Sequence, residues 1–267
     1  METGIQYETI QCKIEGITAK VQLNRPQSMN ALNVQMMREL LCCLKEINNN
    51  EEVNIVVLTG NGSAFSSGGD IKEMLSPGNL AEEKEFHALM DTISELIMTL
   101  YNMSKVTIAS VNGAAAGLGL SLALTADYIV CDENSKLAMN FIGIGLIPDG
   151  GGHFLLERRV GEVKAQQIIW DGKIMRGQEA LEAGIVDKVA KAGQLDEEIE
   201  RIVKECCQKP LQAMIKTKKI FAEMKRPALI KYLELEKYGQ WKMRQTEDHK
   251  EGVQAFIEKR TPNFKGQ

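Results

Sequence analysis

Apolar and polar positions predict a chain that mixes strands and helices. Residues Tyr7–Ile14 and Ile17–Leu23 alternate around a Glu-Gly turn, which is typical of a two-stranded hairpin. An apolar period of 3.6 residues over Val34–Ile47 predicts a helix, with Asn30 as its candidate N-cap. The largely apolar run Val53–Thr59 predicts a buried strand. A strand, a helix and a strand in this order imply a crossover and parallel pairing.

The same patterns continue and then change near residue 195. Glycines and serines predict a loop at Gly60–Gly69, and Ser76–Glu85 is the candidate for a mobile lid. From Leu195 on, glycine becomes scarce and helices dominate, with Pro210 and Pro227 expected at helix starts. A boundary near residue 209 is therefore predicted, between an α/β core (1–209) and a helical extension (210–267). The remaining expected elements are helices at 70–74, 80–103, 118–126, 153–159, 163–170 and from 175, and strands at 106–111, 128–130, 136–139 and 185–189.

Composition narrows the class of protein. The chain has 267 residues, 44% of them apolar and 25% charged, and its net charge is −4. This length and apolar content suffice for one large core. Clustered basic residues typical of nucleic-acid binding, a signal-peptide pattern and a run of bilayer length are all missing. The six cysteines match no zinc spacing. We expect a cytoplasmic protein with no metal, nucleic-acid or membrane partner.

The central stretch, Val111–Val130, together with the strand expected at Val106–Val111, offers backbone donors rather than reactive side chains. A buried strand ends at Asn112-Gly113, and a helix is expected from Leu118. The first N–H groups of a helix lack partners and favour negative charge. A second glycine turn, Ser66–Asp70, follows another buried strand. Two N–H groups that converge on one oxygen would form an oxyanion hole, although two unrelated loops would have the same sequence.

Asp149 is the nearest candidate for acid–base chemistry. It stands alone in an apolar and glycine-rich turn, GLIPDGGG. One interpretation is a turn aspartate that caps the helix starting near Gly151. The other is a base whose pKa is raised by an apolar pocket. The three histidines are scattered and suggest neither a metal site nor a Ser–His–Asp triad.

Five motifs in order make the chain similar to the crotonase superfamily, the enoyl-CoA hydratase/isomerase family. They are LNRPQSMNAL (23–32), GSAFSSGGDIKEM (62–74), VNGAAAGLGLSLALTADYIV (111–130), IGIGLIPDGGG (142–152) and EGVQAFIEKRTPNFKG (251–266). The resemblance implies a spiral of ββα units with a C-terminal helical trimerisation region, assembled as a homo-trimer or a hexamer. It also implies an acyl-CoA thioester as the substrate and no separate cofactor.

The resemblance also assigns expected roles to single residues. The backbone N–H groups of Ser67 and Leu118 match the family's oxyanion-hole positions, and Asp149 matches the acid/base aspartate of several family isomerases. Arg25 and Lys265 match positions near the CoA phosphates, and Lys265 could serve a neighbouring subunit. The residues expected to bind the substrate or CoA are Arg25, Ala64, Ser67, Gly68, Gly69, Asp70, Ile71, Gly117, Leu118, Phe141 and Lys265.

Two departures from the family pattern bear on the reaction. Typical hydratases of the family use two glutamates, and the matching positions here hold Ser121 and Phe141. Phenylalanine cannot transfer a proton, and a neutral serine is a poor base. The ring-opening isomerases of phenylacetyl-CoA degradation are similar in lacking this pair while keeping the aspartate. Dienoyl-CoA isomerases keep the aspartate but have a glutamate where this chain has Phe141.

The sequence therefore predicts an enzyme that shifts a double bond in an enoyl-CoA. Asp149 would remove a proton from one carbon and return it two carbons away, while the oxyanion hole holds a dienolate. One carboxylate suffices for such a shift, because the same group acts first as base and then as acid. Two alternatives stay open at this point: a 2-enoyl-CoA hydratase that uses Asp149 alone, and a catalytically inactive acyl-CoA-binding trimer.

Overall fold

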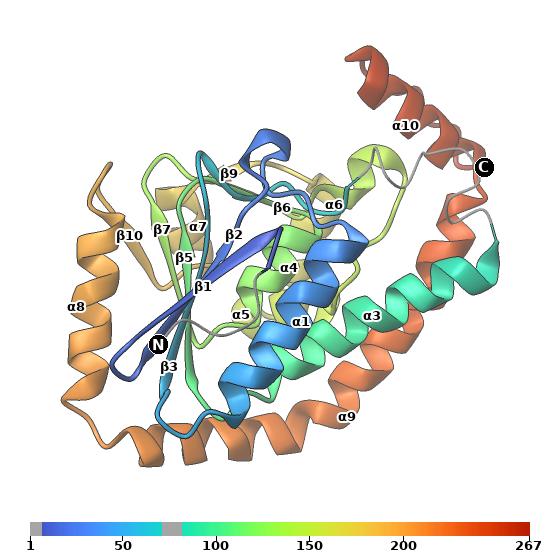
Figure 1. The fold of residues 1–267 in the computed structure, drawn as a ribbon. Coiled ribbons are helices and arrows are strands. Elements are labelled where there is room, and N and C mark those ends of the chain that lie inside the picture. The colour runs from blue at the N-terminus through green and yellow to red at the C-terminus, as the bar shows by residue number, and fades with distance from the viewer. Residues whose placement is uncertain (1–6, 71–81) are drawn as a thin grey trace.

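The computed structural model describes residues 7–70 and 82–267. Two sheets form the centre of the α/β fold (Figure 1). The larger sheet has the order β1-β2-β3-β5-β7-β10, and only β1 and β2 pair antiparallel. Its strands are β1 (Ile10–Glu15), β2 (Thr18–Leu23), β3 (Ile55–Gly60), β5 (Val106–Val111), β7 (Tyr128–Asp132) and β10 (Lys188–Ala190).

The second sheet is smaller and runs beside the ends of the first. Its order is β4-β6-β8-β9, with β9 antiparallel to β8. Its strands are β4 (Ala64–Ser66), β6 (Ala114–Ala116), β8 (Lys136–Ala138) and β9 (Met175–Arg176). The pairs β3/β4, β5/β6 and β7/β8 each place one strand in each sheet before the next helix. The predicted α/β fold of repeating two-strand-and-helix units is thus confirmed.

Helices cover both faces of the larger sheet (Figure 1). One face packs on α8, where Ile199 and Ile202 meet Val57 and Ile108 in one apolar cluster. The other face lies under α1, α3 and α4, which share the larger core. The helices are α1 (Val34–Asn49), α3 (Glu83–Tyr101), α4 (Leu118–Leu124), α5 (Gly152–Val160), α6 (Glu162–Asp171), α7 (Gly177–Ala183), α8 (Leu195–Cys207), α9 (Leu211–Arg244) and α10 (Glu247–Glu258), with short 3-10 helices η1 (Pro26–Ser28) and η2 (Asn140–Ile144).

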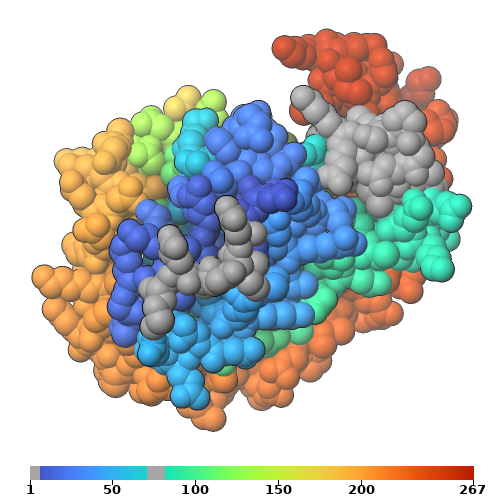
Figure 2. Space-filling view, in the orientation of Figure 1, coloured from blue at the N-terminus to red at the C-terminus, as the bar shows by residue number. Residues whose placement is uncertain are grey.

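The long helix α9 crosses the body of the molecule and leads into α10. Leu229 and Leu233 of α9 are buried in the same core as α1, α3 and α4. In Figure 2 the red helix α10 forms a lobe that projects beyond the rest of the molecule. Its contacts are mainly with η2, where His249 Nδ1 lies 2.7 Å from the Ile144 carbonyl oxygen. The division near residue 209 stays a prediction, and α9 shares its core with the residues before it.

Several local predictions are wrong for identifiable reasons. Asn33, not Asn30, caps α1, because the Asn33 side chain accepts a hydrogen bond from Met36 N. Pro227 does not start a helix but lies inside α9. The expected loop at residues 60–69 contains β4, whose three residues are too few to show an alternating strand pattern. The expected helix at 70–74 and most of the proposed lid fall at residues 71–81, outside the described residues.

Candidate active site

A cavity lies between α1, α3, α9 and the two glycine loops. Its wall is mostly apolar, with four polar side chains. It is lined by Leu32, Asn33, Val34, Met37, Gly69, Asp70, Phe86, Leu89, Met90, Ile93, Leu118, Leu146, Asp149 and Gln240. An apolar pocket with a few convergent polar groups is the usual form of a small-molecule site.

Asp149 places an unsatisfied carboxyl oxygen in the wall of this cavity. Oδ2 accepts a hydrogen bond from Gln240 Nε2 at 3.3 Å. Oδ1 is buried and has no hydrogen-bond partner within residues 7–70 and 82–267. Burial, together with the nearby Glu236 carboxylate, raises the pKa of Asp149 to about 8. A buried carboxyl with one unsatisfied oxygen favours its neutral form, so this group can hold a proton near neutral pH and also release it.

The turn that carries Asp149 is held from both sides. On one side, the Ser121 hydroxyl donates to the Asp149 carbonyl oxygen at 2.8 Å. On the other, Gln240 Nε2 donates to the Ile147 carbonyl oxygen at 2.6 Å. Gly150 has φ +61°, a conformation that favours glycine, and a Cβ there would lie 2.5 Å from Leu118 Cδ1. The carboxyl of Asp149 is therefore fixed relative to α4 and α9.

Glu236 lies behind the turn that carries Asp149 and accepts hydrogen bonds from the backbone that follows it. Its side chain is 2% exposed. It accepts hydrogen bonds from Gly151 N at 2.7 Å and from His153 N at 3.1 Å, and His153 Nδ1 lies 2.8 Å from Oε1. These are the first N–H groups of α5, where a carboxylate is favoured by the helix dipole. The Asp149 side chain does not cap this helix. The interpretation of Asp149 as a turn aspartate that caps α5 is therefore wrong.

Two residues that line the same cavity have backbone N–H groups without a hydrogen-bond partner among the described residues. Leu118 is the first residue of α4, where an N–H has no partner within the helix. Gly69 pairs with Leu32 in an isolated bridge that uses only the flanking groups, namely Gly68 O and Asp70 N. Among the hydrogen bonds of the described residues, none uses the N–H of Gly69 or Leu118.

The prediction that the Ser67 N–H belongs to the oxyanion hole is wrong. Its N–H donates to the Met29 carbonyl oxygen at 2.9 Å and is not available to a ligand. Ser67 does not line the cavity, whereas Gly69, two residues later, does. Gly68 brings the two loops together: its φ is +98°, and a Cβ there would lie 2.8 Å from Ala116 O and 3.5 Å from Leu118 N. The pair of candidate donors is therefore Gly69 and Leu118.

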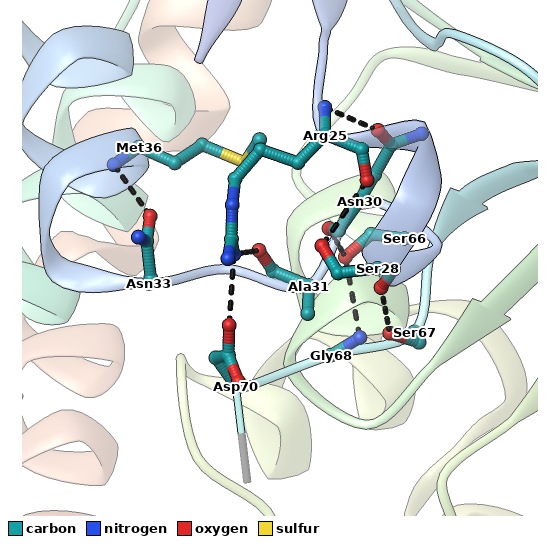
Figure 3. A network of polar contacts seen from close by, with 10 residues as sticks. All are labelled: Arg25, Ser28, Asn30, Ala31, Asn33, Met36, Ser66, Ser67, Gly68 and Asp70. Carbon is teal, nitrogen blue, oxygen red and sulfur yellow. Dashed lines mark hydrogen bonds and ion pairs between the residues drawn. The ribbon is translucent and has the colours of Figure 1, made fainter. Parts of the chain in front are cut away.

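A polar network fixes the loop that carries Gly69 (Figure 3). The Ser66 hydroxyl donates to Asn30 O at 2.8 Å and accepts from Gly68 N at 3.2 Å. Arg25 Nη1 donates to Asp70 Oδ2 at 2.9 Å and to Ala31 O at 2.6 Å. Figure 3 shows the Arg25 side chain reaching across to Asp70 at the end of the loop. Asp70, which lines the cavity, is thus held by Arg25, and the role of Arg25 toward CoA stays a prediction.

The other predicted site residues are spread over several places. Ala64 is buried, and its carbonyl oxygen accepts from Asn30 Nδ2 at 2.7 Å, away from the cavity wall. Phe141 lies against Gly117, whose Cβ position is 3.5 Å from the ring. Lys265 lies beside α10, where its N–H donates to Asp248 Oδ1 at 2.6 Å, and it is absent from the cavity wall. Ile71 lies outside the described residues.

Gln240 and Glu236 were not predicted from the sequence. Both are 2% exposed, and they follow Leu229 and Leu233 on one face of α9. The positions 229, 233, 236 and 240 repeat every three or four residues, which is the spacing of a single buried helix face. Two polar residues that continue an apolar stripe are the signal that could have identified them.

The described part of the chain offers neither a metal centre nor a membrane span. Within residues 7–70 and 82–267, no group of three His, Cys, Asp or Glu side chains could hold a metal ion. No helix in the same part of the chain is both long and apolar enough to cross a bilayer. The six cysteines are all free thiols.

Comparison with known proteins gives a consistent result. A family model described as enoyl-CoA hydratase/isomerase matches residues 13–267. A Bacillus subtilis protein named a putative enoyl-CoA hydratase/isomerase is 48% identical, covering 96% of this chain and 99% of its own. The trans-2-decenoyl-[acyl-carrier-protein] isomerase of Streptococcus mutans is 28% identical and covers 98% and 100%. The crystal structure of an enoyl-CoA hydratase from Mycobacterium avium subsp. paratuberculosis has a TM-score of 0.87 at 28% identity, covering 97% and 100%.

Proposed function

The chain belongs to the enoyl-CoA hydratase/isomerase family, and we propose that it is an isomerase that shifts the double bond of an enoyl-CoA. Asp149 removes a proton from C2 of a 3-enoyl thioester and returns it to C4. The electron pair of the broken C–H bond moves through the thioester and the double bond, so a dienolate forms between the two transfers. The double-bond shift consumes neither water nor any other reactant.

The observation that carries this proposal is the state of the Asp149 carboxyl. Oδ1 is buried, without a partner among the described residues, in the same cavity that Gly69 and Leu118 line. With its pKa raised to about 8, the group exists in both protonation states near neutral pH. A base for the first transfer and an acid for the second is what a 1,3-shift requires. The second cavity carboxylate, Asp70, is paired with Arg25.

The N–H groups of Gly69 and Leu118 would stabilise the oxygen of the dienolate. Donors of this kind act on charge that develops in the transition state, and the loss of one costs about 3–4 kcal/mol of barrier. Both belong to the backbone, so the leucine side chain at position 118 does not interfere with this role. The side chain instead fills the cavity wall next to Asp149.

The positions where family hydratases carry glutamates support an isomerase rather than a hydratase. The Ser121 hydroxyl is used by the Asp149 carbonyl oxygen. A Cβ on Gly152 would lie 3.0 Å from Ser121 Oγ, so the hydroxyl packs closely against the turn that carries Asp149. At the other position, the Phe141 ring packs on Gly117. Neither side chain can activate a water molecule for addition.

A hydratase remains the second candidate, because the similar crystal structure is named an enoyl-CoA hydratase and one relative carries both activities in its name. In that case Asp149 would activate water alone. An inactive acyl-CoA binder, the third candidate, would bind CoA esters without turnover. Assembly as a trimer or hexamer is part of the proposal and rests on the resemblance.

Asp149→Asn tests the reaction. The purified variant and wild type are compared on 3-hexenoyl-CoA by following formation of the conjugated 2-enoyl thioester, and on crotonyl-CoA by loss of its absorbance. We expect isomerisation to fall about 100-fold or more in the variant, as for the loss of an acid–base group. Asp91→Asn, at an exposed residue paired with Lys237, is the matched control and should keep wild-type activity. Near wild-type isomerisation by Asp149→Asn would refute the assignment, and rapid hydration of crotonyl-CoA by the wild type would favour the second candidate.

A further inference from the structure

Gln240 of α9 lines the cavity and directs its side-chain amide at the turn that carries Asp149. Its Nε2 donates to the Ile147 carbonyl oxygen at 2.6 Å and to Asp149 Oδ2 at 3.3 Å. Gly239 lets the helix come this close, because a Cβ there would lie 2.5 Å from Ile147 Cδ1. A carbonyl oxygen can only accept a hydrogen bond, so the nitrogen of the amide, and not its oxygen, must face the turn. The amide therefore has one orientation.

This orientation makes the two oxygens of the Asp149 carboxyl unequal. Oδ2 accepts the hydrogen bond from Gln240, whereas Oδ1 is buried without a partner among the described residues. A protonated carboxyl has one O–H oxygen and one double-bonded oxygen, and the double-bonded oxygen is the better acceptor. The proton of the neutral acid therefore belongs on Oδ1, in the wall of the cavity, and the double-bonded oxygen is Oδ2.

The charged groups nearest to this carboxyl come from α9, α5 and the glycine loop. Glu236 of α9 lies behind the turn, where it meets His153 of α5, and its charge adds to burial in raising the pKa of Asp149. The other carboxylate of the cavity wall, Asp70, is paired with Arg25. Among the described residues that line the cavity, those of α1, α3 and α4 have no titratable side chain. The two nearest charges thus leave the ionised form of Asp149 without a cation of its own.

The Gln240 amide is the one hydrogen-bond donor to the Asp149 side chain within residues 7–70 and 82–267. A donor to a carboxylate favours the ionised form and so opposes the effect of burial. We propose that Gln240 is a positioning residue for the proton transfer: its amide holds Oδ2, leaves Oδ1 as the oxygen that takes and returns the proton, and keeps the carboxyl able to ionise. This inference rests on the proposed function, because it takes Asp149 to be the acid–base group.

Two substitutions with opposite expected effects test the inference. Gln240→Met keeps the length of the side chain and removes its N–H groups, so the pKa of Asp149 should rise by about one pH unit, as for the loss of one hydrogen bond to the charged form. Gln240→Lys keeps a donor and adds a positive charge, so the pKa should fall by about one to three pH units. Damage to the turn would move both variants in the same direction. Gln212→Met, at an exposed glutamine of the same helix, is the matched control and should leave the pKa unchanged.

Infrared difference spectroscopy follows the proton on Asp149 without any turnover. The C=O stretching band of the protonated carboxyl is assigned by its absence in Asp149→Asn and is titrated against pH in each protein. At a pH where this carboxyl is fully protonated, the band of Gln240→Met should lie at a higher frequency than that of the wild type, because the C=O at Oδ2 loses its hydrogen bond. The acid limb of the kcat/KM profile for 3-hexenoyl-CoA should move with the titration, to higher pH in Gln240→Met and to lower pH in Gln240→Lys.

Three results would overturn the inference. The first is an unshifted C=O band in Gln240→Met, which would place the proton on Oδ2. The second is a titration midpoint that stays at the wild-type value or moves in the same direction in both variants. The third is the same change in Gln212→Met. The infrared results do not depend on catalysis, so they are separate from the test of the proposed function, which fails if Asp149→Asn isomerises at the wild-type rate.

Discussion

Asp149→Asn should change how the stability of the protein depends on pH, and the structure gives the sign. An aspartate carboxyl in water has a pKa of 3.8, and in the folded chain the pKa of Asp149 is about 8. Between these values the folded chain keeps a proton that the unfolded chain has released. The native state therefore binds more protons, and the free energy of unfolding falls as pH rises through this window. Asparagine has no proton to lose, so this part of the pH dependence disappears in the variant.

The size of the effect follows from the same two values. A tenfold change in proton affinity is worth about 1.4 kcal/mol, so the full difference is on the order of 5 kcal/mol, spread from about pH 4 to pH 8. The new amide at position 149 has a separate, pH-independent cost, because the site of Oδ1 has no partner for a buried N–H, and such a group costs about 1–3 kcal/mol. At about pH 5 the free energy of unfolding of the variant should therefore be below or near that of the wild type. From there to about pH 8 it should rise relative to the wild type by about 1 kcal/mol per pH unit.

Urea unfolding at pH 5, 6, 7 and 8, with a fixed protein concentration, measures this difference. The slope of the free energy against urea must stay the same in both proteins for the comparison to hold. Asp91→Asn serves as the control, since Asp91 is exposed and its difference from the wild type should hardly vary with pH. Parallel curves for the wild type and Asp149→Asn would refute the reasoning, because Asp149 would then not titrate between pH 5 and 8.

Three further changes test the groups around this carboxyl and the outer surface. Leu118→Pro removes one cavity N–H at the first position of α4, where proline is tolerated, and should lower kcat for 3-enoyl-CoA about 100- to 1,000-fold. Leu118→Ala keeps the N–H, and an equal loss there would instead assign the effect to the side chain. Glu236→Gln removes a charge that raises the pKa of Asp149, so the acid limb of the kcat/KM profile should move to lower pH; a limb that stays in place would leave burial as the only cause. Met224, 76% exposed beside the exposed Phe221 on α9, should lie in a subunit contact, and Met224→Lys should reduce the assembled mass in size-exclusion chromatography; an unchanged mass would exclude that contact.

The sequence predicts the parts of the fold that depend on residues close to one another in the chain. The strand at Val106–Val111 is observed with the expected bounds, and the helix expected from Val34 starts there. The start of α4 at Leu118 also follows from the local pattern of a buried strand, a glycine break and an apolar run. Short strands such as β4 and β6 escape prediction, because three residues show no strand pattern and pair only when the neighbouring turns of the spiral stack on them.

The choice of the oxyanion donor could not come from local pattern. Ser67 and Gly69 stand two residues apart in one loop, and both have an N–H in the sequence. What separates them is the Met29 carbonyl oxygen, 38 positions away in the chain, which takes the N–H of Ser67. Which N–H stays free is decided by the strand-like pairing of two distant segments, and a single sequence does not display that pairing.

The acid–base properties of Asp149 depend on α9 in the same way. Gln240 and Glu236, which bond to its carboxyl and to its turn, stand 91 and 87 positions after it. Pro227 suggested a break in this region because proline in a helix costs about 3 kcal/mol. Helix α9 continues through it, since Ala222 before it and Leu229 after it are buried and hold both halves against the body. The continuous path through Pro227 is what carries Glu236 and Gln240 to the turn, so the packing of the helical region and the proton affinity of Asp149 are set by one element.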